Sequence, residues 1–384
     1  MKLLFQLFIF LLPTQLAYHF WPNFAFIRGV RVDYLAPAVY LSELVLFTLL
    51  VLWIYKDRRI LFEILRHWRV LVLLLAVAGI NILNSPLVFL SFYKWIRVVE
   101  LLALYFFIKR QKQVLHLIKL PVTISLILTL FLALTQMIKS ASVGGIFYWL
   151  GERSFSSNSP DIALVNVFGR EFLRPYATFP HPNALAGFAL VLLFMFWRGK
   201  GLAHKIIVTV SLALVFLSFS QNAWLALFAA PLLVIIIKKV KLGFWKFLTS
   251  AAVASFFLTI LPIQGPKEIF ERGELNTAAG RLVSLSPVYG VGLGVFVSML
   301  PELLWSKTIW LLQPVHNIFL LLSSEVGILG LVLFVYFIGK NMNAKNLLPV
   351  IALVLTGFFD HYWVSFVQNY LLMAIVLGLD ERKI

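Results

Sequence analysis

The stretch from Gln313 to Gly330 combines residue types that could do chemistry. Its polar start, Gln313 to Asn317, leads directly into an apolar run that carries serines, a glutamate and two glycines. An imidazole readily takes up and releases a proton near neutral pH, so His316 could act as a general base on a hydroxyl group. A helix that begins near Pro314, where a missing N–H is harmless, would place His316 and Asn317 in its first turn. The positive end of the helix dipole would then favour an anion beside them.

Spacing along this stretch predicts which side chains share a face with His316. At about 100° per residue, Ser323, Gly327 and Gly330 fall within about 40° of the histidine. Glu325 falls about 180° away, which favours a packing or salt-bridge role over a role in orienting the base. The small residues could form a close helix-packing seam or a slot for a lipid. His316 could also be an interfacial residue that only caps the helix.

Composition defines the kind of element that must position these residues. Of the 384 residues, 61% are hydrophobic and 13% charged, and the mean hydropathy is +0.94. That leaves too little polar surface for a soluble protein of this size. We therefore expect an all-α polytopic membrane protein, one integral membrane domain over residues 1–384, with about twelve spanning helices of about 20 residues each. No cysteine is present, so disulfides and thiolate-metal sites are excluded.

The net charge of +17 could suggest a nucleic-acid partner, but the basic residues are distributed as membrane topology would require. Most of the 33 Lys and Arg lie in alternate short loops and at both chain ends, namely Lys2, 56–69, 109–119, 198–205, 238–246, 340–345 and 382–383. By the positive-inside rule, this face and both termini are cytoplasmic. Membrane lipids, and no nucleic acid, are the partners that this pattern predicts.

Apolar runs and polar breaks predict where the spans lie. We expect helices near 3–20, 35–55, 68–84, 87–108, 114–138, from 183 onward, 203–219, 222–238, 244–262, 316–338, 347–359 and 364–379. Large outer loops are expected at about 139–180 and 263–313. Within 87–108, Lys94, Arg97 and Glu100 lie one turn apart, and a local Arg97–Glu100 pair is favoured over a site-lining role.

Three polar helix starts should converge on the outer face in this topology. They contain the pairs His181/Asn183, Gln221/Asn222 and His316/Asn317. The two outer loops that lead into them carry arginines, whose planar guanidinium can bind phosphate oxygens in a bidentate manner. Such groups could hold a diphosphate without a metal, and the scattered outer carboxylates predict no metal site. Asp360 and His361, in the last outer turn, could contribute a further acceptor-side group or form a neutral pair.

Four local patterns resemble those of one family. His316-Asn317 is followed after nine residues by Gly327 and after two more by Gly330. Arg174 to Gly187 contains Arg-Pro-Tyr-Ala-Thr-Phe-Pro-His-Pro-Asn, and Arg281 is followed after ten residues by Gly292. The fourth pattern is Ser220-Gln221-Asn222-Ala223-Trp224. Together they resemble the O-antigen ligase and polymerase superfamily of bacterial membrane glycosyltransferases. Gln221 stands where that family commonly has an arginine.

The resemblance implies an activity and roles for these residues. A glycan would pass from a polyprenyl (undecaprenyl) diphosphate donor to an acceptor hydroxyl at the outer face of the bacterial cytoplasmic membrane, in the synthesis of lipopolysaccharide or another cell-surface polysaccharide. Arg174 and Arg281 would clamp the diphosphate, and His316 would be the general base. Asn317, His181, Asn183, Gln221, Gly292, Gly327 and Gly330 would support the site. No cofactor or metal is expected, and a single displacement would invert the anomeric configuration.

The sequence leaves several alternatives open. Ligase-like attachment and polymerase-like chain extension use the same donor, and the acceptor could be a glycolipid, a growing glycan, a protein side chain or a cell-wall polymer. A different class, a transporter or flippase of a lipid-linked or anionic substrate, would also be an α-helical membrane protein. Transporters often contain repeats and interrupted helices, neither of which is evident in the sequence.

Overall fold

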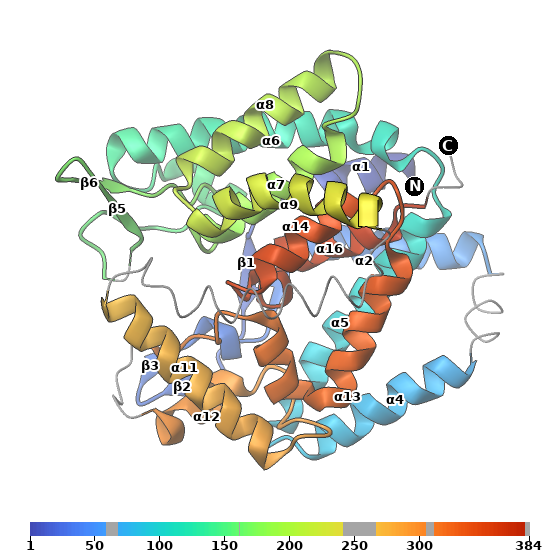
Figure 1. Cartoon of the computed structure of the whole chain (residues 1–384), viewed down its shortest axis with the longest axis vertical. Helices are drawn as coiled ribbons and strands as arrows, with labels where there is room; N and C mark the ends of the chain where they lie inside the picture. Colours follow the sequence, from blue (N-terminus) through green and yellow to red (C-terminus); the bar gives the residue numbers. More distant parts are fainter. Residues whose placement is uncertain (59–67, 161, 241–265, 305–310, 381–384) are drawn as a thin grey trace.

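The chain is mostly helical in the computed structural model, which describes residues 1–58, 68–160, 162–240, 266–304 and 311–380 (Figure 1). Three helices in this part of the chain are long and apolar enough to cross a membrane, namely Val114–Lys139, Gln221–Lys239 and Ile318–Asn341. The all-α class is therefore confirmed, with three short two-stranded sheets as minor additions. The number of twelve spans stays a prediction.

The helices and strands follow the sequence in this order: α1 (Lys2–Leu11), β1 (Ala17–His19), the 3-10 helix η1 (Asn23–Ala25), β2 (Phe26–Ile27), β3 (Val30–Arg31), η2 (Asp33–Leu35), β4 (Ala38–Tyr40), α2 (Leu41–Lys56), α4 (Trp68–Leu83), α5 (Val88–Arg110), α6 (Val114–Lys139), η3 (Gly145–Leu150), β5 (Leu164–Val167), β6 (Arg170–Leu173), α7 (Pro182–Phe196), α8 (Leu202–Leu217), α9 (Gln221–Val240), α11 (Pro266–Leu285), α12 (Phe296–Leu303), α13 (Ile318–Asn341), α14 (Leu347–Gly357), α15 (Tyr362–Ser365) and α16 (Val367–Gly378).

Helices α7, α14 and α16 form the centre of the molecule (Figure 1). Nearly every residue of α7 and α16 is buried, as expected for helices that are apolar on all sides. Helix α7 packs on α8, α9, α14 and α16, while α5 packs on α16. The loops that precede α7 and follow α14 are therefore attached to the most deeply buried helices of the fold.

Most predicted ranges match the structure to within a few residues, and three do not. The predicted helix at 35–55 begins only at Leu41, because β4 occupies Ala38–Tyr40. The apolar run at 3–20 contains a helix only as far as Leu11, because Ala17–His19 pairs with Ala38–Tyr40 in an antiparallel ladder. The predicted outer loop at 263–313 contains the helices α11 and α12. Helix α11 was missed because its sequence is polar overall and its buried face, Leu275, Ala278, Ala279 and Leu282, is short and half alanine. The predicted helix at 244–262 lies outside the described residues.

Helix α13 begins later than predicted and is interrupted. Asn317 is its N-cap, so His316 precedes the helix instead of lying in its first turn. Gly327 has φ +68° and ψ −177°, a non-helical conformation in which a Cβ would come within 2.2 Å of the Val288 carbonyl oxygen. The predicted alignment of Ser323, Gly327 and Gly330 beneath His316 is therefore wrong, because it assumed one regular helix.

A glycine-rich segment, residues 286–294, packs into the break in α13. Its backbone supplies the partners that the broken helix lacks: Val291 N–H donates to Ser324 O (3.0 Å), Gly292 N–H to Glu325 O (2.9 Å), and Ile328 N–H to Pro287 O (2.9 Å). Asn81 of α4 donates through Nδ2 to Tyr289 O (2.7 Å) and Glu325 O (2.8 Å). The break is thus hydrogen-bonded on both sides, as a buried backbone requires.

Candidate functional site

The turn Phe359–His361, between α14 and α15, is the point where the three polar helix starts meet. Asn183 Nδ2 at the start of α7 donates to Asp360 Oδ2 (2.9 Å), and Asn222 Nδ2 at the start of α9 donates to Phe359 O (3.3 Å). His316, just before α13, has its Nδ1 atom 3.8 Å from Asp360 Oδ1. The predicted convergence of the three starts is confirmed, and its centre is Asp360.

Side-chain caps explain how these helix starts are fixed locally. Asn317 Oδ1 accepts hydrogen bonds from the backbone N–H groups of Phe319 (2.9 Å) and Leu320 (3.1 Å). His181 Nδ1 accepts one from Asn183 N–H (3.1 Å), and Pro182 follows at the first helical position. Some N–H groups that the sequence analysis assigned to an anion are therefore used by the protein itself. The helix dipoles still direct positive potential toward the turn.

A chain of polar contacts joins Arg174 to His316. The guanidinium of Arg174 donates through Nη2 to Asn183 Oδ1 (2.5 Å) and through Nε to Ser218 O (2.8 Å). The amide of Asn183 in turn donates to Asp360, whose second oxygen faces His316. One amide thus orients both an arginine and a carboxylate, which fixes the geometry of the group.

Charge in this group is concentrated on Asp360. Burial acts to raise the pKa of its carboxyl group, but the contacts with His316 and His361 outweigh burial and hold that pKa below its usual range. Burial lowers the pKa of His361 to about 3, against the opposing effect of Asp360. Burial and the neighbouring Arg174 lower the pKa of His181 to about 3. Near neutral pH, Asp360 is therefore a charged carboxylate, and His361 and His181 are neutral imidazoles. The carboxylate lies between these two imidazoles and His316.

His316 is more accessible than Asp360. Its side chain is 22% exposed, whereas that of Asp360 is 6% exposed. Its ring lies 5.4 Å from the ring of His361, centroid to centroid. Within the described residues, Nδ1 of His316 has no hydrogen-bond partner, and neither has Nδ1 of His361. Nδ1 of His316 thus faces Asp360.

His316, Asp360 and His361 also have the composition of a metal site. Their ligand atoms all lie within 4.8 Å of one another, and imidazole nitrogen with carboxylate oxygen is a donor set that suits zinc. Sequence reasoning predicted no such cluster, because Asp360-His361 lies far along the chain from His316. The adjacent acid and histidine in a predicted outer turn were the only sequence signal, and that signal left their role open.

Arg281 is not part of this group in the structure. It is exposed on α11 and donates to Leu303 O (3.1 Å). Arg272, on the same helix, donates instead to Phe359 O (3.3 Å), the carbonyl that also accepts from Asn222. Nine residues separate the two arginines, which corresponds to about 13 Å along the helix and about 180° around it. Arg272 thus brings a positive charge beside the turn Phe359–His361, close to the start of α9.

The three predicted glycines have packing roles. A Cβ on Gly292 would lie 2.4 Å from Ser85 Oγ, and a Cβ on Gly330 would lie 2.5 Å from the Val326 side chain. Gly292 and Gly327 belong to the contact between the segment 286–294 and α13. They support the site through the placement of α13.

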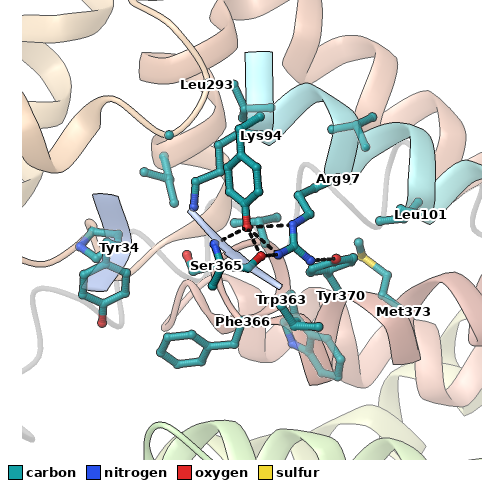
Figure 2. Close-up of a pocket in the computed structure, with 18 of the residues that line it drawn as sticks. Tyr34, Lys94, Arg97, Leu101, Leu293, Trp363, Ser365, Phe366, Tyr370 and Met373 are labelled. Carbon is teal, nitrogen blue, oxygen red and sulfur yellow. Dashed lines mark hydrogen bonds between the residues drawn. The ribbon is translucent and has the colours of Figure 1, made fainter. Parts of the chain in front are cut away.

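A cavity of about 1490 Å³ begins beside the candidate site, where His181 and Pro314 line it. It continues between α4, α5, α13 and α16 to Lys109 and Lys340, near the C-terminal ends of α5 and α13. Figure 2 shows its middle, with Arg97 hydrogen-bonded to Tyr370 (3.1 Å). Apolar side chains interleave with the polar ones along its wall, as in a site for an amphipathic molecule.

Arg97 forms the charged cluster at the middle of this cavity. Its Nη1 atom lies 3.6 Å from Glu100 Oε2, which confirms the predicted pair, and it also contacts Glu43. Tyr370 donates to both carboxylates, at 2.9 Å to Glu43 and 2.7 Å to Glu100. Lys94, one turn away, also lines the cavity. Arg97 therefore forms an ion pair within the protein and also lines the cavity.

Comparison with protein-family models and with curated proteins finds no match for this chain. The class of protein that the described residues define is a mostly helical protein with apolar helices able to cross a membrane. Its candidate site joins a histidine, a buried carboxylate and an arginine.

Proposed function

We propose that this protein is a membrane glycosyltransferase of the O-antigen ligase and polymerase type. It transfers a glycan from a polyprenyl diphosphate donor to an acceptor hydroxyl at the outer face of the cytoplasmic membrane. The observation that carries the proposal is the pairing of partly exposed His316 with buried Asp360, which Asn183 ties to Arg174. A base, a group that orients it and a cation for an anionic leaving group are thereby close together.

The chemistry assigns one role to each member. The acceptor O–H gives its proton to Nε2 of His316 as its oxygen attacks the anomeric carbon of the donor. The bond from that carbon to the diphosphate oxygen breaks, and the diphosphate leaves with the electron pair. Asp360, facing Nδ1, stabilises the imidazolium that forms. Arg174, with Arg272 nearby, supplies positive charge toward the leaving diphosphate. A single displacement of this kind inverts the anomeric configuration.

The membrane arrangement follows from the same proposal. About twelve helices cross the membrane, and the basic loops and both termini face the cytoplasm. The candidate site then opens outward, under the segments 139–180 and 266–313. The cavity that begins at His181 lies where the hydrocarbon chain of a lipid-linked donor would have to enter.

Substitution of His316 tests the proposal. Purified His316→Ala protein, given a polyprenyl-diphosphate-linked glycan and an acceptor, should lose glycan transfer by at least about 10²-fold. His116→Ala is the matched control, because His116 is exposed at the start of α6, and it should retain full activity. Turnover by the His316 variant equal to that of the control would refute the assignment. Gel and mass analysis of the product separates attachment in one step from stepwise chain growth.

A transporter of an anionic or lipid-linked substrate is the second candidate, and two observations favour it. Helix α13 is interrupted at Gly327, and the cavity reaches from His181 to Lys340. Interrupted helices at a polar cavity are typical of transporters. Single cysteines placed along α5 in this cysteine-free chain would decide between a transporter and a transferase. Labelling that alternates between the two membrane faces on addition of substrate supports transport, whereas labelling only from outside supports the transferase.

A further inference from the structure

Helix α6 packs on α1 and α8, near the top of Figure 1. Away from these contacts it carries a stripe of large apolar side chains that the described residues leave exposed, namely Leu120, Ile124, Ile127, Phe131, Leu134 and Ile138. Their spacing of three and four residues places them on one face of the helix. The stripe is about 27 Å long, close to the roughly 30 Å of a bilayer's hydrocarbon core. This face of α6 is therefore matched to lipid.

The segment after α6 folds back along this stripe. Phe147, in the 3-10 helix η3, lies 6.2 Å from Phe131, ring centroid to ring centroid. Phe131 precedes Lys139, the last residue of α6, by about 12 Å along the helix. The chain thus leaves α6 at Lys139 and returns to the level of its exposed apolar side chains. The outer loop predicted at 139–180 therefore begins beside the lipid-matched face of α6.

Hydrogen bonds inside the protein hold this turn in place. The carboxylate of buried Glu152 accepts the backbone N–H groups of Val143 and Gly144, each at 2.7 Å. The same carboxylate accepts a hydrogen bond from Nε2 of Gln136, a residue of α6, at 2.8 Å. The turn is therefore tied to α6 through Glu152, and the outward side chains of η3 take no part in these bonds.

Large apolar side chains cover the outer side of η3. Ile146, Tyr148 and Trp149 are 72%, 53% and 68% exposed, and Gly145–Leu150 contains no charged residue. The rings of Tyr148 and Trp149 meet edge to face, with their centroids 5.6 Å apart. Tryptophan and tyrosine concentrate at membrane–water interfaces, because each ring is mainly apolar and carries one polar group. Such a surface is unfavourable in water and favourable at the boundary of a bilayer.

We infer that η3 is a membrane anchor, with Ile146, Tyr148 and Trp149 in contact with lipids of the outer leaflet beside α6. The bilayer itself covers this surface, because the surface continues the lipid-matched stripe of α6 at Phe131. Tyr148 also lines the cavity, so the anchor fixes one wall of the cavity at the membrane surface. The inference rests on the part of the proposed function that places α6 across a membrane with its C-terminal end outward. It does not require glycan transfer.

Spin labels on single cysteines test the inference in this cysteine-free chain, reconstituted into lipid vesicles. Each label is exposed to oxygen, which partitions into lipid, and to a water-soluble nickel chelate. The ratio of oxygen to chelate accessibility at Ile146→Cys and Trp149→Cys should be at least about threefold that at Ser154→Cys. Ser154 is the matched aqueous control, because it is a small polar residue exposed in the same segment. Ile138→Cys, at the end of the stripe, is the lipid reference.

Three outcomes would overturn the inference. Ratios at positions 146 and 149 equal to that at 154, with Ile138→Cys in lipid, would place η3 in water while α6 stays in the membrane. Labels at 146 and 149 shielded from both reagents would mean that protein, such as a second copy of this chain, covers the turn. An aqueous label at Ile138→Cys would refute the membrane position of α6 and the anchor together. Loss or retention of glycan transfer bears on none of these readings.

Native tryptophan fluorescence tests the same contact without a label. Brominated phospholipid should quench the wild-type protein by a larger intensity than it quenches Trp149→Phe, because the difference between the two proteins reports Trp149 alone. The phenylalanine keeps an aromatic ring at this position, so the variant preserves most of the packing. Equal losses of fluorescence intensity in the two proteins would contradict lipid contact at Trp149.

Discussion

Asp360 Oδ1 lies 3.8 Å from Nδ1 of His316, although the two residues come from different inter-helix segments. The other carboxylate oxygen is fixed by Asn183, and Oδ1 also accepts the backbone N–H of His361 (2.8 Å). A carboxylate held in this way cannot rotate away from the histidine without losing two hydrogen bonds. The contact is longer than a hydrogen bond and would shorten when His316 takes up a proton.

Asp360→Asn should therefore impair turnover more than binding. It leaves the shape intact but removes the charge that stabilises an imidazolium at His316, so kcat should fall by about 10²–10⁴-fold with little change in KM. Steady-state transfer assays measure the two constants separately. Thermal unfolding of the same sample controls for misfolding, and a folded variant with wild-type kcat would contradict this role.

The variants Arg272→Gln and Arg281→Gln test which arginine is functional, the one that the structure places at the turn or the one that the sequence pattern indicated. Arg272 contacts the Phe359 carbonyl, whereas Arg281 is exposed and points to Leu303. Loss of Arg272 should reduce kcat/KM by about 10-fold or more through weaker stabilisation of the diphosphate, while loss of Arg281 should have little effect. Parallel kcat/KM measurements decide, and the reverse order would restore the Arg281 pattern as the functional one.

Acidification should destabilise the protein through its buried histidines. The pKa of His361 is about 3 in the folded chain, against an ordinary value of 6.5. Between these values the unfolded chain binds more protons, so stability falls as pH drops from 6.5 toward 3. His361 contributes up to about 1.4 kcal/mol per pH unit in this window. Thermal unfolding from pH 7 to pH 4 should show a decline that His361→Gln makes shallower; an identical slope in the variant would contradict the burial of a neutral His361.

Gly327→Ala should destabilise the fold by about 2–4 kcal/mol. A Cβ there would come within 2.2 Å of the Val288 carbonyl oxygen and would also strain a positive φ. Gly273→Ala is the control, because nothing lies within 4 Å of its Cβ and an alanine in a helix is slightly favoured. Chemical unfolding of both variants gives the two free energies. If Gly327→Ala lowers the free energy of unfolding no more than the control does, α13 can continue as a regular helix through residue 327.

Helix positions were predictable because they depend on local apolar runs and helix-start signals. His181 and Pro182 show this, since a capping side chain and a proline mark the start of α7 within the sequence itself. At α13 the signal was read less well, since the start was predicted near Pro314 whereas Asn317 is the N-cap. The predicted meeting of three helix starts followed from topology alone. These parts need no knowledge of distant contacts.

The rest of the site depends on contacts between distant segments, which local patterns do not encode. Asp360 lies beside His316 only because the end of α14 and the start of α13 come together. Arg272 lies on α11, in a segment predicted to be a loop. The break at Gly327 is stabilised by residues 286–294 and by Asn81, far away in the sequence. A helical wheel drawn through Gly327 therefore assigned neighbours to His316 that the structure separates.

The break in α13 also bears on how the protein is made. Unpaired backbone groups in lipid cost several kcal/mol, so the interrupted conformation is favourable only when Asn81 and the segment 286–294 are already beside it. If α13 spans a membrane, the segment 318–341 alone would be most stable as an uninterrupted helix. The conformation at Gly327 would then require α4 and the segment 286–294 to be packed against α13 first.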